Sequence, residues 1–398
     1  MKLPALLLGC LCILTLPLHA AEKNAFALER GVNISHWLSQ RGEMPRELMQ
    51  TYFTEFDVIM LSEAGFDHIR IPIDEVEFWD DDGRPREDAW AFLEQALGWA
   101  ERHGLRAIVD LHIIRSHYFN AANEGMNDAN TLWEDPAEQE KFVQLWEEIS
   151  DRIGSHPVDW VAYEFMNEAV GSDHEDWNKL LRAVYGRIRE LEPQRTFVLG
   201  SFNFQSMGTL DQLWVPEGDP NLVISFHNYD PFLVTHHMAE WNRAGLYKGP
   251  IQYPGKPVPD ESLLDDLPED VREAIKTRNQ PFSYETILKT LQPAVDCAKK
   301  HNLPVYCGEW GCIIYAPREI RLAYYRDWIR AFRELGISQA IWDYQGHFRI
   351  VNPRTRVIDH ELIDILTREG PAVDPIPDDH PGKDRGASES RVIRPRHP

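Results

Sequence analysis

After its first twenty residues the chain has no apolar run near the roughly 20 residues that a membrane span requires. It is also poor in positive charge, with 41 Lys and Arg against 64 Asp and Glu, and its formal net charge is −23. So acidic a surface repels phosphate backbones and anionic membranes, which argues against a nucleic-acid partner. A neutral substrate would feel little of this field, and acidity also keeps a secreted protein soluble.

Cysteine is scarce as well. Of five cysteines, Cys10 and Cys12 lie in the N-terminal segment, which leaves Cys297, Cys307 and Cys312. An odd number cannot pair completely within the chain, and the spacing matches no zinc-binding pattern. We expect buried thiols, with one disulfide as the alternative in an oxidising compartment. We expect neither a metal nor a cofactor.

The N-terminal segment is typical of a signal peptide. Lys2 precedes an apolar run over residues 6–18, and Leu18-His19-Ala20 supplies a small residue at the cut. We therefore expect residues 1–20 to be removed and the protein to be secreted or periplasmic. The alternative is a lipoprotein site at Cys10, which would leave a very short signal.

Short apolar runs alternate along the chain with longer amphipathic stretches. The runs are almost continuously apolar, as expected for parallel strands that are buried on both faces. Eight are predicted as strands: residues 31–35, 68–73, 107–112, 161–167, 196–201, 222–228, 305–309 and 339–344.

The stretches between these runs favour helices. Apolar residues recur at helical spacing in residues 89–102, 138–153, 177–191 and 320–335. Eight strands alternating with helices predict an α/β fold, a single-domain (β/α)8 TIM barrel over residues 21–370. A doubly wound sheet is the alternative, but no glycine-rich phosphate loop follows any early strand. Residues 231–281 form a long connection that is functional or disordered, and residues 371–398 are expected to be disordered.

Polar side chains gather at the ends of the predicted strands, where this barrel carries its chemistry. Glu168 follows the fourth strand and Glu309 ends the seventh. A lone charged residue at such a place is more often a salt-bridge partner, but here two glutamates converge with other polar residues. Glycoside hydrolysis needs such a pair, with one carboxyl to protonate the leaving oxygen and one to attack the sugar carbon. The converging residues are Arg70, His112, Asn167, Glu168, His227, Tyr229, Glu309 and Trp342.

In this order, over about residues 30–349, the sequence resembles glycoside hydrolase family 5, the cellulase-like branch of the retaining clan. The family's shared set of Arg, His, Asn-Glu, His-x-Tyr, Glu and Trp is complete. Two positions depart from it. Ala169 stands where Asn-Glu-Pro is common, and Ile113 stands where many relatives carry a second histidine.

The resemblance implies a role for each residue. Glu309 would be the nucleophile and Glu168 the acid/base, with carboxyls ~5 Å apart and the pKa of Glu168 raised by that closeness. Arg70 and Tyr229 would hold Glu309 ionised. The other roles are a hydrogen bond to the sugar 2-OH from Asn167, sugar hydroxyl binding by His112, a place near the acid/base for His227, and a stacking floor from Trp342.

Three further tryptophans are candidates because aromatic faces pack against pyranose rings. Trp37 follows the first strand, Trp241 lies in the long connection, and Trp310 adjoins Glu309. We include Trp37 and Trp241 in the site, with core or loop packing as the alternative. For Trp310 packing is the favoured interpretation, as it is for Cys307 and Cys312.

The expected function is hydrolysis of a β-linked polysaccharide by a monomer. Residues 227–232, with Thr235, His236 and Trp241, look similar to bacterial endoglucanases, which favours an endo-β-1,4-glucanase. The same site would also suit β-mannan, xyloglucan, mixed-linkage or β-1,3-glucan. A non-catalytic carbohydrate-binding relative would have lost a glutamate, and a phosphate-binding barrel would need more glycine than Gly346-His347 offers.

Overall fold

The structure, a computed structural model, describes residues 23–121, 126 and 130–368. The predicted signal peptide and the predicted disordered tail lie outside these residues. Among the helices of the described part, none is long and apolar enough to cross a membrane.

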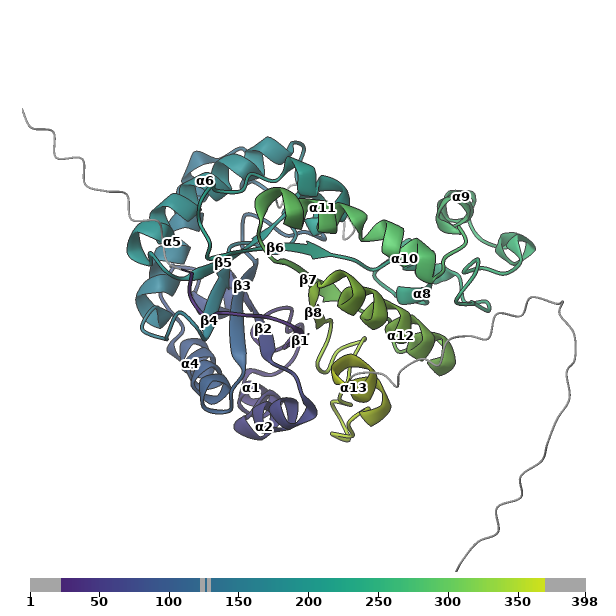
Figure 1. The fold of residues 1–398 in the computed structure, drawn as a ribbon, viewed down its shortest axis with the longest axis horizontal. Helices are drawn as coiled ribbons and strands as arrows, with labels where there is room; N and C mark the ends of the chain where they lie inside the picture. The colour runs from purple at the N-terminus through teal and green to yellow at the C-terminus, as the bar shows by residue number, and fades with distance from the viewer. Residues whose placement is uncertain (1–22, 122–125, 127–129, 369–398) are drawn as a thin grey trace, which may run out of the picture. The chain divides into compact units, whose positions relative to one another are not determined.

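Eight parallel strands close into a barrel in the order of the sequence, with helices around it (Figure 1). The barrel closes where β1 pairs with β8, at Val32 beside Ile341, while Val32 on its other side faces Ile69 of β2. Each predicted strand is present, and the predicted (β/α)8 barrel is confirmed. The strands are β1 Arg30–Asn33, β2 His68–Asp74, β3 Arg106–Ile113, β4 Val161–Glu164, β5 Thr196–Gly200, β6 Leu222–His227, β7 Val305–Trp310 and β8 Ser338–Ile341.

Burial explains the apolar strands. All residues of β2, β4, β5, β6 and β7 are buried, because the barrel core covers one face and the helices cover the other. The four predicted helices are present as α4 Glu87–Arg102, α5 Pro136–Ile153, α6 His174–Leu191 and α12 Arg318–Leu335. Asp135 and Asp173 cap α5 and α6 by accepting from backbone N–H groups of the first turn.

Shorter elements complete the chain. They are η1 Arg46–Leu48, α1 Met49–Tyr52, α2 Glu55–Ala64, α3 Glu75–Phe78, α7 Phe202–Gln205, η2 Met207–Gln212, α10 Tyr284–Thr290, α11 Gln292–His301 and α13 His360–Thr367.

The long connection over residues 231–281 is built from short elements of its own. They are α8 Phe232–Thr235, η3 Arg243–Leu246, η4 Glu261–Leu264 and α9 Glu269–Arg278, and the part around α9 extends beyond the ring of helices in Figure 1. The connection is tied to the barrel beyond β7, where the backbone N–H of Ile313 donates to the carbonyl of Thr235 at 3.0 Å. It therefore lies at the end of the barrel that carries the predicted site.

The three cysteines of the described residues are free and buried. This agrees with the expectation of buried thiols, and the alternative of a disulfide is not formed.

Candidate active site

The two glutamates reach the same end of the barrel by different routes. Glu309 lies within β7, whereas β4 ends at Glu164, three residues earlier than predicted. The chain still follows β3, because the backbone N–H of Asn167 donates to the carbonyl of Leu111 at 3.2 Å. It then turns at Glu168, whose φ of 46° is left-handed. Likewise β8 ends at Ile341 rather than at Tyr344.

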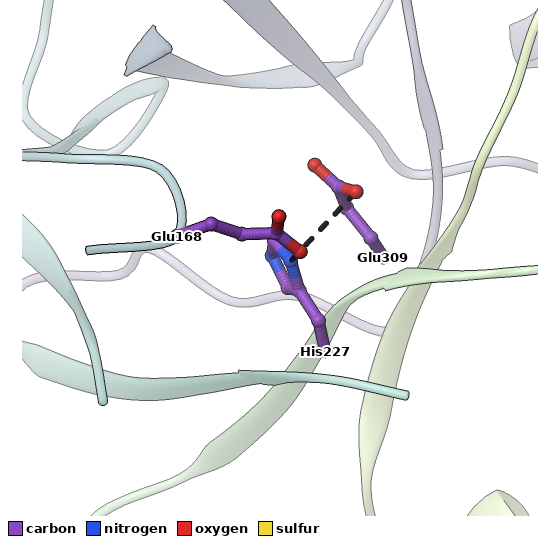
Figure 2. A group of neighbouring side chains, drawn as sticks. All are labelled: Glu168, His227 and Glu309. Atoms are coloured by element: carbon purple, nitrogen blue, oxygen red, sulfur yellow. Dashed lines mark hydrogen bonds and ion pairs between the residues drawn. The ribbon is translucent and has the colours of Figure 1, made fainter. Parts of the chain in front are cut away.

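Figure 2 shows the carboxyl groups of Glu168 and Glu309 facing each other beside the ring of His227. A side-chain oxygen of each glutamate and a ring nitrogen of His227 lie within 4.8 Å of one another. The nearest contact is 2.9 Å, between Nδ1 of His227 and Oε1 of Glu168. The two glutamates are only 8% and 5% exposed, so their charges interact with little screening by water.

Among the described residues, one cation, Arg70, contacts the carboxylates around Glu309. The guanidinium of Arg70 is fully buried and donates to Oε1 of Glu309 at 2.9 Å and to Oε2 of Glu164 at 2.6 Å. It also lies 3.0 Å from Oδ2 of Asp110. Its remaining hydrogen bonds go to the side-chain oxygens of Asn33 and Asn167. Arg70 therefore fixes the position of Glu309 and offsets its negative charge.

Tyr229 holds the other oxygen of Glu309. Its hydroxyl donates to Oε2 at 3.0 Å, and burial raises the pKa of Tyr229 well above its usual range, so the donor stays protonated. In the part of the chain that the structure describes, no Arg or Lys forms an ion pair with Glu168. Its close partner is His227, whose pKa is lowered well below the usual value by burial and by the charge of Arg70.

The pKa of Glu168 is therefore raised well above its usual value, first by burial and then by the charge of Glu309. Burial also raises the pKa of Glu309, but the Arg70 guanidinium opposes that rise. Two carboxylates this close disfavour ionisation of both, and the hydrogen bonds of Arg70 and Tyr229 to Glu309 favour a proton on Glu168.

The rings of His112 and Trp342 lie parallel to each other near the pair. They stack with centroids 5.6 Å apart and planes at 9°. Nδ1 of His112 lies 2.6 Å from Oδ2 of Asp110, which fixes the ring, and burial lowers the pKa of His112 to about 3. His112 is therefore neutral near pH 7.

Asn167 offers a spare donor at this site. Its Oδ1 accepts from Arg70 at 2.8 Å, while its Nδ2 is buried without a hydrogen-bond partner among the described residues. A buried amide donor without a partner is costly, which points to a ligand as its partner.

A pocket of about 790 Å³ opens above the pair, within the range of ligand-binding sites. It brings together most of the predicted residues, namely His112, Glu168, His227, Tyr229, Trp241, Glu309 and Trp342. Trp241 is 40% exposed, with its ring 5.2 Å from that of His347. Further aromatic residues line the pocket: Tyr118, Phe119, Phe204, Phe232 and Phe348.

Trp37 is not part of this pocket, and the prediction that it extends the site is wrong. It is 1% exposed, packs against Phe53 and Phe92, and donates its indole N–H to the carbonyl of Met49 at 2.8 Å. The strand before it ends at Asn33 and the chain turns at His36 with a φ of 57°, which directs the next side chain into the core. Trp310 is also buried, as the favoured interpretation had it.

Several residues of the site were missed from sequence. Asp110 and Glu164 are fully buried partners of Arg70. A carboxylate within an otherwise apolar strand is a signal that could have found them, because a buried charge requires a partner. Gln205 and Phe204 carry no such signal, because they follow β5 in a backbone conformation that non-glycine residues seldom adopt.

By geometry alone, the group of Glu168, His227 and Glu309 could also hold a metal ion. Arg70 already supplies a positive charge at Glu309, which disfavours a second cation there. The absence of a metal remains a prediction.

Residues 32–348 match the family described as Cellulase (glycosyl hydrolase family 5). The chain belongs to glycosyl hydrolase family 5. As a member of that family it is a glycoside hydrolase.

Two curated relatives cover nearly the same part of the chain. Endoglucanase C of Acetivibrio thermocellus is 31% identical over 346 residues, which is 86% of this chain and 98% of the relative. Cellodextrinase A of Ruminococcus flavefaciens is 28% identical over 344 residues, which is 85% of this chain and 93% of the relative. Among solved structures, Thermotoga maritima Cel5A in complex with cellobiose superposes with a TM-score of 0.67 at 23% identity, over 85% of this chain and 96% of that one. This last likeness bears on the fold alone.

Proposed function

We propose that this protein is a secreted, retaining endo-β-1,4-glucanase. The observation that carries the proposal is the spacing and unequal environment of the two glutamates. Oxygens of Glu168 and Glu309 lie within 4.8 Å, near the ~5 Å of retaining enzymes and well below the ~6.5–9.5 Å that leaves room for the water of inverting ones.

The first step divides the work between the two carboxyls. Glu309, held ionised by Arg70 and Tyr229, attacks the anomeric carbon and forms a covalent glycosyl-enzyme. Glu168 enters protonated and passes its proton to the departing glycosidic oxygen. In the second step the Glu168 carboxylate takes a proton from water, which attacks the anomeric carbon and releases Glu309.

The remaining predicted residues bind sugar. Nδ2 of Asn167 donates to the sugar 2-OH, where contacts strengthen in the transition state. Trp342 gives the ring being cleaved a stacking surface, His112 binds its hydroxyls, and His227 keeps Glu168 in place. Trp241 extends the pocket toward further sugar units.

The glucan assignment is supported by endoglucanase C and cellodextrinase A, which resemble this chain over most of its length. β-Mannan is a competing substrate that the same site would suit, and Thermotoga maritima Cel5A has been solved in complex with mannotriose. That structure is 23% identical to this chain, with a TM-score of 0.66 over 85% of it and 97% of the other chain.

The test is a panel of carboxymethylcellulose, mixed-linkage β-glucan, xyloglucan, β-1,3-glucan and β-mannan, assayed with wild type, Glu309→Gln and the exposed control Glu217→Gln. We expect the highest kcat/KM on a β-1,4-glucan, with viscosity falling faster than reducing ends appear. Glu309→Gln should lose activity and Glu217→Gln should keep it. A wild type inactive on every polymer contradicts the function, and an active Glu309→Gln contradicts the choice of nucleophile.

We also propose that residues 1–20 are a signal peptide, 21–370 the catalytic domain and 371–398 a disordered tail. The mass of the protein exported by a bacterial host tests the first boundary. Cleavage after Ala20 or Ala21 agrees with it, and a lipid-modified Cys10 contradicts it.

A further inference from the structure

The turn after β5 has an unusual backbone. Asn203 has φ 55° and ψ 68°, Phe204 has φ 61° and ψ 36°, and Gln205 has a φ of 50°. These are three consecutive left-handed residues, none of them glycine, and L-residues avoid that region because Cβ meets the backbone. Such conformations persist where the surroundings fix them, and they are found most often at functional sites.

Gln205 is the residue that the turn buries. It is fully buried, and its amide makes three hydrogen bonds. Nε2 donates to Oε1 of Glu164 at 3.0 Å and to Oγ of Ser225 at 3.1 Å. Oε1 accepts from the backbone N–H of Glu168 at 2.9 Å. The last bond holds the backbone of the proposed acid/base through a side chain, at a residue that is itself left-handed.

These bonds connect the two glutamates through one buried network. Gln205 binds Glu168 on one side and Glu164 on the other, Glu164 binds Arg70 at 2.6 Å, and Arg70 binds Glu309 at 2.9 Å. Each member is at most 8% exposed, so a hydrogen bond lost there is not replaced by bulk water. The separation of the two carboxyls is thus set in part through Gln205.

Gly200, the last residue of β5, is shaped to this arrangement. A Cβ placed on it would lie 2.5 Å from Cδ and 2.6 Å from Nε2 of Gln205. A side chain at position 200 would therefore overlap the Gln205 amide, and glycine leaves that space free.

We propose that Gln205 is a positioning residue. It holds the backbone of Glu168 so that the Glu168 carboxyl lies within reach of the leaving-group oxygen. The inference rests on the proposed function. Without the Gln205 amide, the Glu168 backbone loses its anchor, and its carboxyl departs from the scissile oxygen while Glu309 keeps Arg70 and Tyr229. The defect therefore falls on proton transfer and spares nucleophilic attack.

Two substrates with different leaving groups separate these steps. The glycosidic bond of cellotetraose needs a proton from Glu168, whereas dinitrophenolate leaves 2,4-dinitrophenyl β-cellobioside without one. Gln205→Met keeps the length of the side chain and removes its amide. Since general acid catalysis contributes ~10²–10⁴-fold in rate, a partial loss should lower kcat/KM on cellotetraose at least ~10-fold. On the dinitrophenyl substrate it should stay within about threefold. Equal losses on both substrates, or none on either, would overturn the proposal.

Two companion variants complete the test. Gly200→Ala leaves Gln205 in the chain but displaces its amide, and should show the same selective loss, so it decides the matter if Gln205→Met does not fold by circular dichroism. Gln339→Met removes another buried glutamine, bonded to Trp310 and to neither glutamate, and should leave the ratio of the two kcat/KM values unchanged. Wild type inactive on both substrates rejects the proposed function itself, whereas equal losses in the variants of an active enzyme reject only the role of Gln205.

Discussion

Replacing Arg70 with methionine should make the stability of the protein fall more steeply with rising pH than that of the wild type. Arg70 is fully buried and is the one cation in contact with Asp110, Glu164 and Glu309 among the described residues. Methionine has a similar length and carries no charge. The variant therefore leaves three carboxyls in the barrel without a compensating charge.

The loss in free energy of unfolding depends on whether those carboxyls are ionised or neutral. Breaking a buried ion pair costs about 3–5 kcal/mol when the remaining charge stays ionised. When the carboxyls are neutral, what is lost is hydrogen bonds, at about 1–2 kcal/mol. Since domains unfold with about 5–15 kcal/mol, both losses are measurable.

Burial raises the pKa of Asp110 to about 7 and that of Glu164 above its usual value, even though Arg70 opposes both shifts. A carboxyl with a higher pKa in the folded state binds a proton on folding, so its contribution to stability is present at low pH. That contribution is lost as pH rises from about 4 toward the folded-state pKa. Removing Arg70 raises these pKa values further, so the deficit of the variant grows from pH 5 to pH 8.

Urea unfolding followed by tryptophan fluorescence measures this deficit. We expect Arg70→Met to lose about 1–2 kcal/mol at pH 5 and about 3–5 kcal/mol at pH 8. Arg195→Met is the matched control, because Arg195 is equally buried but binds one carboxylate, Glu192, and otherwise backbone carbonyls. Its deficit should change little with pH. A deficit of Arg70→Met that is constant, or smaller at pH 8, would refute the reasoning.

Three further outcomes are expected. Trp241→Ala should raise KM for cello-oligosaccharides roughly 3- to 30-fold, about 0.7–2 kcal/mol, with little change in Tm; an unchanged KM would place this ring outside the binding path. Trp37→Ala should lower the free energy of unfolding by about 3–5 kcal/mol and leave KM unaltered, and a stable variant with a raised KM would return Trp37 to the site. Dialysis against EDTA should leave kcat unchanged, because the proposed chemistry uses two carboxyls and no ion; activity lost to EDTA and restored by a divalent cation would assign Glu168, His227 and Glu309 to a metal site.

The barrel could be predicted from the sequence because parallel strands buried on both faces must be apolar runs, and eight such runs alternate with amphipathic helices. Strand ends were less well defined. Phe165 and Met166 are as apolar as strand residues and remain buried, yet β4 ends at Glu164. An apolar residue indicates burial. The point at which two strands stop pairing depends instead on backbone geometry, which the apolar pattern does not reveal.

The two glutamates and their direct partners Arg70, Tyr229 and His227 could be predicted from the sequence, whereas Asp110, Glu164 and Gln205, which bind behind them, were missed. Arg70, Glu168 and Glu309 follow a pattern shared by a family, but Gln205 acts through a left-handed turn that has no glycine to mark it. The prediction for Trp37 was wrong for a related reason, because the turn at His36 sets the direction of the Trp37 side chain. Local backbone conformation decides both cases, and residue type does not reveal it.

Proton NMR of the first product of cellotetraose hydrolysis tests the central claim most directly. If Glu309 attacks the anomeric carbon and Glu168 then activates water, two inversions take place and the signal of the β-anomer appears first, with the α-anomer growing in later by mutarotation. Initial release of the α-anomer would show a single inversion and would contradict the account of this pair.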